Sequence, residues 1–468
     1  MQSMVKRVQQ RVKNNLFGNQ NGSKIAGFIL VTAIAFGVMY LLSCLKSTNN
    51  LQNDEVSIAL EWNQFILKAE INAEGFRGPV AARAYGYIGL AAYEAALPGL
   101  AGNFQSMVKL FPGIKLPSPP SRDHFNVAAS LNACYAAIIG KFFMSSPDPV
   151  LKHRLEIMDS WENKIKNETD TMSLRVSTDF GKGVAEAVYQ WSATDTLGFE
   201  ANHHNYMRDY TPPIGDGLWV TSPYFPMPAL LPYWGKVRPF IINTEEYKAK
   251  PLPEFSSAPN QFYYTQALEI LSLSKPLSAE NQWIAEFWND DHPGLTFTPA
   301  GHWLAITNEV IDKEHPTIEK TLETYLKIGF ALSDAMIACW DSKFYYNHER
   351  PETFIQKYLD KDWRPYSPSP SFPSYPSGHS MMGAAASEVL TKLYGDHYAM
   401  TDRSHDDLRD IVIKPRQFHS FDEMAKESAL SRMLVGVPFR FDCEEGLRLG
   451  DLIGREVSRL ELEKKLTK

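Results

Sequence analysis

The sequence has few cysteines and no surplus of positive charge. Its four cysteines, Cys44, Cys134, Cys339 and Cys443, are spread over 468 residues. This spacing excludes a disulfide framework and a paired-cysteine zinc site. Its 47 basic residues are outnumbered by 54 acidic ones, which gives a net charge of −7, so the overall charge does not favour nucleic acid as a partner. Any anion site must therefore be built locally.

The N-terminal segment has the features of an export or anchoring signal. Residues 1–24 contain basic but no acidic residues, and an uncharged apolar run over 25–45 follows. That run is long enough to cross a bilayer, and the basic flank would keep the N-terminus inside. It closes on Leu-Leu-Ser-Cys44, which resembles a bacterial lipoprotein cleavage box with a lipidated cysteine. A lipoprotein signal and an uncleaved transmembrane anchor both place the body on the exported side of a bacterial membrane, in the periplasm or on the outer surface. A buried core helix is the third alternative.

The chain from residue 46 onwards is expected to be mostly α-helical. Apolar residues recur at intervals of three and four, the spacing of one buried helix face, and alternating strand-like runs are few. We divide this body into an N-terminal helical half over 46–250 and a C-terminal helical bundle over 251–468. The stretch from Asn202 to Pro253, rich in proline, glycine and aromatic residues, is expected to be a long ordered loop. Helices are predicted near residues 54–72, 79–97, 124–144, 150–166, 178–194, 279–288, 317–341, 379–394, 421–435 and 444–465.

Two cations lie close together in the first of three unusual clusters. Lys343 and Arg350 are seven residues apart, which is about two helical turns, so both side chains are expected on one helix face. Pro351 disfavours continuing the helix through Arg350. Taken alone, this pair is typical of a solvated helix face.

The second cluster, Pro376-Ser377-Gly378-His379, precedes a run of small residues that is expected to be helical. A hydroxyl, a glycine amide and an imidazole at a helix N-terminus suit an anion, because free N–H groups and the helix dipole point at the same place. The imidazole adds a proton donor and acceptor near neutral pH. A Ser-Gly turn that only caps a helix is the alternative.

The third cluster runs from Ser431 to Asp442 and contributes another cation, Arg432. The three clusters together resemble the signature of the vanadium-dependent haloperoxidases, within the type 2 phosphatidic acid phosphatase superfamily. That signature is Lys-x6-Arg-Pro, then Pro-Ser-Gly-His, then Ser-Arg-x5-His-x3-Asp. The chain matches it except that Pro438 occupies the position of the third-motif histidine. The matching motifs span residues 285–446, and general similarity begins near Trp62.

The resemblance implies helical bundles of the acid phosphatase/vanadium-dependent haloperoxidase type. It also implies vanadate as cofactor, with hydrogen peroxide, halide and small organic molecules as substrates and hypohalous acid as product. The binding residues would be those that neutralise or hydrogen-bond the oxyanion: Lys343, Arg350, Ser377, Gly378, His379 and Arg432. His379 would be the general acid/base, with Lys343 also catalytic and Asp291 hydrogen-bonded to the His379 imidazole. Trp340 and Phe372 resemble the aromatic lining of the halide pocket in chloroperoxidases.

Pro438 weakens this implied function. In the family, the histidine at this position bonds directly to vanadium or forms a phosphohistidine, and proline can do neither. Residues 431–468 contain no histidine that a small shift could bring in, and His405 and His419 lie upstream. We therefore expect no direct bond from protein to metal, and a large loss of vanadate affinity. Gly436 can end the preceding helix, so Pro438 need not disturb the fold.

Three functions remain open from the sequence. The first is a membrane-tethered haloperoxidase weakened by Pro438, the second is a phosphomonoesterase of the same superfamily, and the third is a non-catalytic oxyanion-binding protein. The missing nucleophile and the aromatic lining argue against the phosphomonoesterase. Two further histidines, His292 and His302, are expected to have structural roles.

Overall fold

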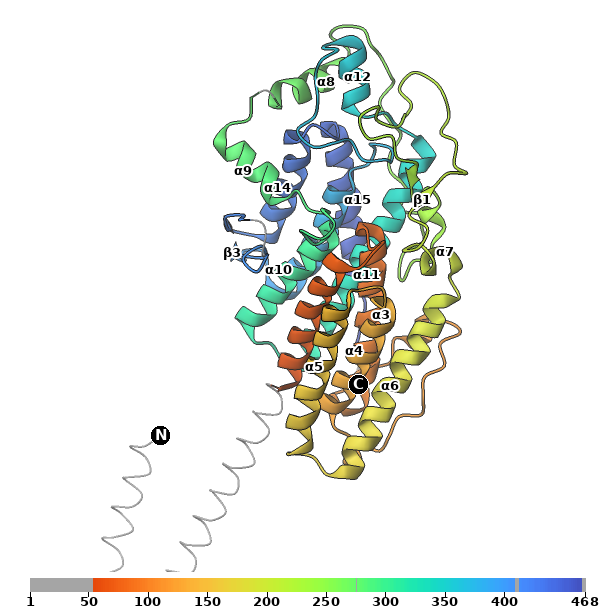
Figure 1. Ribbon diagram of the computed structural model, residues 1–468, viewed down its shortest axis with the longest axis vertical. Coiled ribbons are helices and arrows are strands. Elements are labelled where there is room, and N and C mark those ends of the chain that lie inside the picture. Colours follow the sequence, from red (N-terminus) through yellow and green to blue (C-terminus); the bar gives the residue numbers. More distant parts are fainter. Residues whose placement is uncertain (1–53, 275, 409–411, 465–468) are drawn as a thin grey trace, which may run out of the picture. The chain divides into compact units, whose positions relative to one another are not determined.

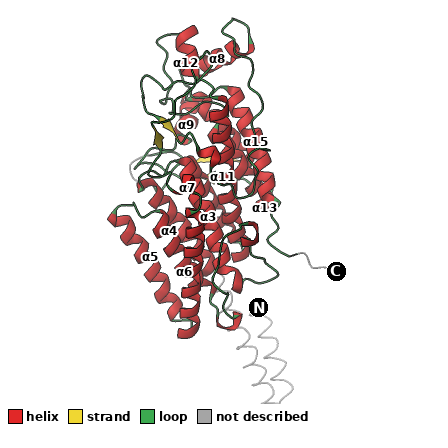
Figure 2. Ribbon diagram, turned by 90° about the vertical axis from the view of Figure 1, so that its right-hand side faces the viewer, coloured by secondary structure: helices red, strands yellow, loops and turns green. Residues whose placement is uncertain are grey.

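The computed structural model describes residues 54–274, 276–408 and 412–464. Residues 55–468 form one compact unit, in which helices predominate beside two short pairs of antiparallel strands (Figures 1 and 2). The predicted fold class, mostly α, is confirmed. None of the described helices is both long and apolar enough to span a bilayer. The predicted anchor over 25–45, with Cys44, lies outside the described residues.

The N-terminal part is a bundle of long helices that the periodicity predicted. Its α-helices are a helix over 54–72, α3 (Gly78–Ala96), α4 (Val127–Phe142), α5 (Asp148–Lys166) and α6 (Thr171–Ala193). Short 3-10 turns connect them: η1 (Leu97–Gly99), η2 (Val108–Leu110) and η3 (Arg122–His124). Side chains at the helix starts satisfy free N–H groups; Asp170, for example, accepts hydrogen bonds from two backbone N–H groups of α6.

Helix α3 joins this bundle to the C-terminal half. All of its residues are buried, and it packs along α11 (Ile318–Tyr346). Glycines make the contact close: a Cβ atom at Gly89 would lie 3.1 Å from the backbone of Leu326, and one at Gly329 would lie 2.7 Å from the carbonyl oxygen of Tyr85. The two halves therefore share a core, and the division at residues 250 and 251 stays a prediction.

The predicted long loop is confirmed, and it is fixed to the C-terminal half. It follows the short helix α7 (Thr196–Phe199) and contains β1 (Tyr206–Met207), β2 (Ala229–Leu230) and η4 (Trp234–Lys236), and β1 pairs antiparallel with β2. The buried carboxylate of Asp334, on α11, accepts hydrogen bonds of 2.7, 2.7 and 3.0 Å from the backbone N–H groups of Phe240, Ile241 and Ile242. These bonds hold the loop against the end of the molecule that carries the motifs.

The C-terminal part is a second group of helices. It contains α8 (Phe262–Leu273), α9 (Ala279–Phe287), α10 (Pro299–Glu314), α11, α12 (Pro351–Tyr358), α13 (Gly378–Tyr394), α14 (Phe421–Leu434) and α15 (Arg440–Ser458), with β3 (Met400–Asp402) paired to β4 (Arg416–Phe418). Glycines at four-residue intervals bring α15 onto α13: a Cβ atom at Gly450 would lie 2.2 Å from the carbonyl oxygen of Met381. This close packing fixes the N-terminus of α13.

Three of these helices were not predicted. Helix α10 begins with Pro-Ala-Gly, a composition typical of a loop, but Thr298 caps it by accepting a hydrogen bond from the Gly301 N–H group. Helices α8 and α12 have only 12 and 8 residues, so the helical spacing repeats only a few times in each. The last helix was predicted to reach residue 465, whereas α15 ends at Ser458.

Candidate active site

Lys343 lies in the last turn of α11, and its side chain is 1% exposed. Its Nζ donates hydrogen bonds of 2.8 Å to the carbonyl oxygens of Pro373 and Ser374, which uses two of three ammonium hydrogens. Burial lowers the pKa of Lys343 to about 8. The third hydrogen is available for a ligand.

Arg350 reaches the same place by a turn of the chain. Helix α11 ends where Asn347 adopts the left-handed conformation, with φ of +47°, and Arg350 caps the next helix, α12. The prediction that Lys343 and Arg350 share one helix face is therefore wrong. They nevertheless converge, because both donate to the Pro373 carbonyl oxygen, and their charged groups lie 5.1 and 4.9 Å from the centre of the Phe372 ring.

The other contacts of Arg350 are also with carbonyl oxygens. Its guanidinium donates to Phe372 at 3.0 and 2.8 Å and to Val437 at 3.0 Å. Burial lowers the pKa of Arg350 to about 10, which leaves it protonated at neutral pH. The guanidinium is thus held in place as a buried cation.

The start of α13 supplies hydrogen-bond donors. Ser377 is its N-cap residue, and the Ser377 Oγ accepts hydrogen bonds from Ser380 N at 3.4 Å and Ser380 Oγ at 2.9 Å. The backbone N–H of Ser377 donates to the carbonyl oxygen of Asp442 at 2.9 Å. As expected for a first helical turn, the N–H groups of Gly378 and His379 find no partner within the described chain. This is the arrangement that the Ser-Gly-His sequence predicted for an anion.

His379 has an unsatisfied imidazole. Its Nε2 atom is buried and has no hydrogen-bond partner among the described residues. Burial, and then the positive charge of Arg432, hold the pKa of His379 well below its usual range. The ring is therefore neutral and free to hydrogen-bond a ligand.

Arg432, near the end of α14, completes the set of cations. Its Nη1 lies 3.4 Å from the carbonyl oxygen of Trp288 and 3.4 Å from Oδ1 of Asn289, and both distances are long for hydrogen bonds. Burial lowers the pKa of Arg432 to about 10. Its guanidinium keeps donor capacity for a ligand.

We call Lys343, Arg350, Ser377–His379 and Arg432 the oxyanion cradle. In the described part of the chain, none of its three cations forms a salt bridge with a carboxylate. Buried charges in proteins are normally paired. Three buried cations beside free helix N–H groups and an unpaired imidazole therefore fit a tetrahedral oxyanion.

Asp442 and His348 lie just behind the cradle. Burial raises the pKa of Asp442 to about 6, and its carboxylate accepts hydrogen bonds from Ser374 Oγ at 2.6 Å and Phe439 N at 2.8 Å. The Nδ1 atom of buried His348 lies 3.7 Å from Asp442, and its Nε2 lies 2.7 Å from the Tyr263 hydroxyl. His348 was not among the predicted site residues, although it lies two residues before Arg350 in the first motif.

Asp291 does not contact His379 in the way that was predicted. It adopts a φ of +73°, and its carboxylate forms a salt bridge of 3.1 Å with Arg77. Both side chains line a cavity of about 450 Å³. The preceding residue, Asp290, is the acidic group whose charge acts on His379. Asp291 has a left-handed backbone and its side chain pairs with Arg77. The predicted hydrogen bond between Asp291 and His379 is therefore corrected.

The two predicted halide-pocket aromatics flank the cradle. The ring centres of Trp340 and Phe372 lie 4.9 Å apart, and the Lys343 ammonium lies 5.8 Å from the Trp340 ring centre. The Trp340 N–H group donates to the carbonyl oxygen of Leu230, in the long loop. Their role toward halide stays a prediction.

Pro438 occupies a buried position in the wall of the cradle. Its neighbours are fixed, because the carbonyl oxygen of Val437 accepts from Arg350 and the N–H of Phe439 donates to Asp442. Gly436 has a φ of +82° just after α14, as expected for a residue that ends a helix. The proline is thus accommodated without loss of the surrounding contacts.

Comparison with known proteins agrees with this geometry. Residues 356–464 match the model of the VCPO second helical-bundle domain. The structure of a bacterial vanadium-dependent iodoperoxidase is similar, with a TM-score of 0.76 and 27% identity over 88% of this chain and 98% of that chain. A vanadium haloperoxidase domain model and a bacterial vanadium iodoperoxidase structure are thus both similar to this chain.

Two structures of a more distantly similar protein share the fold. A bacterial vanadium-dependent chloroperoxidase in its holo form gives a TM-score of 0.63 at 16% identity, over 83% of this chain and 93% of that chain. Its apo form gives 0.61 at 16% identity, over 81% and 92%. A search of curated protein sequences finds no match.

Proposed function

We propose that this protein is a vanadium haloperoxidase, which binds vanadate in the oxyanion cradle and oxidises halide with hydrogen peroxide to hypohalous acid. The observation that carries the proposal is the buried excess of positive charge beside the unpaired His379 imidazole. The similarity to vanadium haloperoxidases supports the choice of vanadate, and vanadate and phosphate are both tetrahedral oxyanions.

The residues of the cradle have distinct proposed roles. The guanidinium groups of Arg350 and Arg432 would bind oxygens of the anion, and Lys343 would supply a compact charge. The Ser377 hydroxyl and the Gly378 N–H group complete the hydrogen bonds. Because Arg350 and Lys343 are already fixed by carbonyl oxygens, they need little rearrangement to bind.

His379 is the proposed acid/base group. Its neutral ring would accept a proton at Nε2 from an incoming peroxide or water and would later return it. When bound, vanadate supplies a Lewis acid that polarises the O–O bond of peroxide. Trp340 and Phe372 would exclude water from the halide beside Lys343, and small organic molecules would be halogenated outside the cradle.

Pro438 supports a weakened activity and favours a second candidate. The proline side chain has no atom that can coordinate vanadium, so the oxyanion would be held by charge and hydrogen bonds alone. Its affinity is therefore expected to be low. A non-catalytic oxyanion-binding protein would keep the cradle and lose the reaction. The phosphomonoesterase is disfavoured, because its nucleophile would also stand at this position.

The experiment that separates these candidates is halogenation of a phenolic dye by the purified full chain. Activity with peroxide and bromide or iodide that requires added vanadate, and that rises in Pro438→His, supports the haloperoxidase. Phosphate binding by calorimetry without dye halogenation, in both wild type and Pro438→His, supports the non-catalytic protein. Hydrolysis of an aryl phosphate that is lost in His379→Ala would instead support the phosphomonoesterase.

We further propose that the body is tethered on the exported side of a bacterial membrane by residues 25–45, or by lipid on Cys44. The basic flank and the uncharged apolar run support this proposal. Fractionation of cells expressing wild type and Cys44→Ala tests it. Release of only the variant from membranes indicates lipidation, retention of both indicates a transmembrane anchor, and recovery of both in the soluble fraction refutes tethering.

A further inference from the structure

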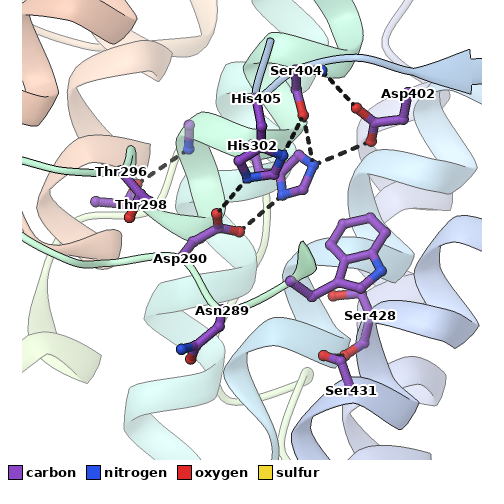
Figure 3. A network of polar contacts seen from close by, with 12 residues as sticks. Asn289, Asp290, Thr296, Thr298, His302, Asp402, Ser404, His405, Ser428 and Ser431 are labelled. Carbon is purple, nitrogen blue, oxygen red and sulfur yellow. Dashed lines mark hydrogen bonds and ion pairs between the residues drawn. The ribbon is translucent and has the colours of Figure 1, made fainter. Parts of the chain in front are cut away.

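A second buried cluster of ionisable side chains lies beside the cradle. It consists of Asp290, in the loop after α9, His302, in the first turn of α10, and His405, in the turn after β3. Figure 3 shows the two imidazoles next to each other with the Asp290 carboxylate facing both. The side chains are 1 to 2% exposed. We call these three residues the Asp-His cluster.

Its donor atoms have the spacing of a metal site. Asp290 Oδ2 lies 2.9 Å from His302 Nδ1, and Asp290 Oδ1 lies 3.3 Å from His405 Nε2. One ligand atom from each residue falls within 4.8 Å of the other two. In a tetrahedral zinc site with bonds of roughly 2.1 Å, donor atoms lie about 3.4 Å apart. Two imidazoles and a bidentate carboxylate give four donors with only small movements.

The imidazole nitrogens that face away from Asp290 also have hydrogen-bond partners. His302 Nε2 lies 3.1 Å from the Asp402 carboxylate and 3.0 Å from Ser404 Oγ, and His405 Nδ1 lies 3.3 Å from Ser404 Oγ. In metal sites, the second ring nitrogen of a ligating histidine is usually bonded to such a group, which orients the ring and makes it a better ligand. The cluster has this arrangement for both histidines.

The surroundings suit a structural ion. The Trp288 indole stacks on His302 with ring centres 4.5 Å apart, and the rings of Phe287 and Phe297 lie 5.0 Å from His405. Asp290 and Asp402 bring two negative charges into this apolar pocket. A divalent cation would balance them.

From this geometry we infer that Asp290, His302 and His405 bind one divalent transition-metal ion, with Zn²⁺ the best match to two nitrogens and a carboxylate. The ion would cross-link the loop after α9, α10 and the turn after β3. The loop carries Trp288 and Asn289, whose oxygens accept from Arg432, so the ion would also steady one wall of the cradle. This site is separate from the oxyanion cradle, and the inference does not depend on the proposed function.

Metal analysis of the purified full chain tests the inference, with Zn²⁺ itself as the probe. We expect about one zinc per chain after incubation and desalting, and a higher melting temperature with zinc than after chelation. Cobalt in place of zinc should give the visible absorption of a four-coordinate ion. His405→Gln can keep a hydrogen bond to Asp290 but is a poor ligand, so it should remain folded and lose the zinc.

A control variant is His419→Ala, because His419 is 88% exposed and should not change zinc content. No zinc in the wild type and no change of melting temperature on adding Zn²⁺ would overturn the inference. The same would follow if His405→Gln bound zinc as the wild type does. In either case the cluster would be a closed ring of hydrogen bonds.

Discussion

The three cations of the oxyanion cradle and the side chains of the Asp-His cluster are all buried, yet the two regions have opposite charge. Among the described residues, the hydrogen-bond acceptors of the cradle cations are carbonyl and amide oxygens, whereas the two imidazoles of the cluster meet the carboxylates of Asp290 and Asp402. The pKa values of the histidines in the two regions are shifted in opposite directions. Nearby cations and burial hold the pKa of His379 well below its usual value, while Asp290 and Asp402 outweigh burial and raise the pKa of His302 to about 10. In both buried regions, the charge of the neighbouring groups acts strongly on the histidine. Positive neighbours favour an anion in the oxyanion cradle, and negative neighbours favour a cation in the Asp-His cluster.

Removing the acid/base group should have the largest effect. We expect His379→Ala, made in the Pro438→His background, to lower the turnover of dye halogenation by roughly 10² to 10⁴-fold. Phosphate affinity should change much less, since the cations remain. Steady-state kinetics together with calorimetry separate the two effects. Equal losses of turnover and of affinity would mean that His379 acts mainly in binding.

Restoring a ligand should have the next largest effect. Groups that only orient a metal ligand change affinity by roughly 10 to 100-fold, so a direct ligand should matter at least as much. Pro438→His is therefore expected to tighten vanadate binding by about 100-fold or more. Calorimetry with vanadate measures this change, and Pro438→Ala is the matched control. Equal affinities of the two variants would show that this position does not reach the anion.

The cradle should bind anions less well at high pH. Because burial lowers the pKa of Lys343 to about 8 in the free protein, anion binding above that pH requires uptake of a proton. We expect the affinity for sulfate, which does not titrate in this range, to be constant below pH 7 and about tenfold lower at pH 9. Lys343→Arg keeps its charge, so its profile should be flat over this range. A flat wild-type profile would argue against Lys343 as the titrating group.

The contact between α13 and α15 should be sensitive to added volume. A methyl group at Gly450 would meet the carbonyl oxygen of Met381 at 2.2 Å, and overpacking of this kind costs roughly 1–3 kcal/mol. Gly450→Ala is expected to lower the free energy of unfolding by about that amount in chemical denaturation. Leu452→Ala, at a residue that is 40% exposed on the same helix, is the control. If both variants were equally stable, the close contact would not limit stability.

Asp291 should matter least. Its salt bridge with Arg77 is partly exposed, at 28% and 22%, and such pairs contribute no more than about 1 kcal/mol. We expect Asp291→Asn to leave halogenation within about twofold of its parent. A loss near that of His379→Ala would restore the predicted pairing of Asp291 with His379.

The sequence predicted individual helices and motifs better than the contacts between them. The helical periodicity located α3, α11 and α13 well, since each combines an apolar face with a capping residue or a proline at its start. It missed α10, because Thr298 and Pro299 start a helix with residues that also form turns. The motifs identified the three cations and His379, but their approach depends on the turn at Asn347 and on carbonyl oxygens of residues 372–374.

Long-range pairs were the least predictable. Asp290 and Asp291 are neighbours of the same type, yet Asp290 contacts His302 whereas Asp291, with a φ of +73°, pairs with Arg77. The Asp-His cluster combines residues 12 and 100 or more positions apart. Nothing in the local sequence of His405 marks it as a partner of Asp290.

Calorimetric titration of the full chain with inorganic phosphate tests the oxyanion cradle most directly, with Arg432→Ala as the comparison. We predict that one phosphate binds per wild-type chain and that the variant, which loses a buried cation, shows no measurable binding. Absence of binding to the wild type, or equal binding by the variant, would contradict the account.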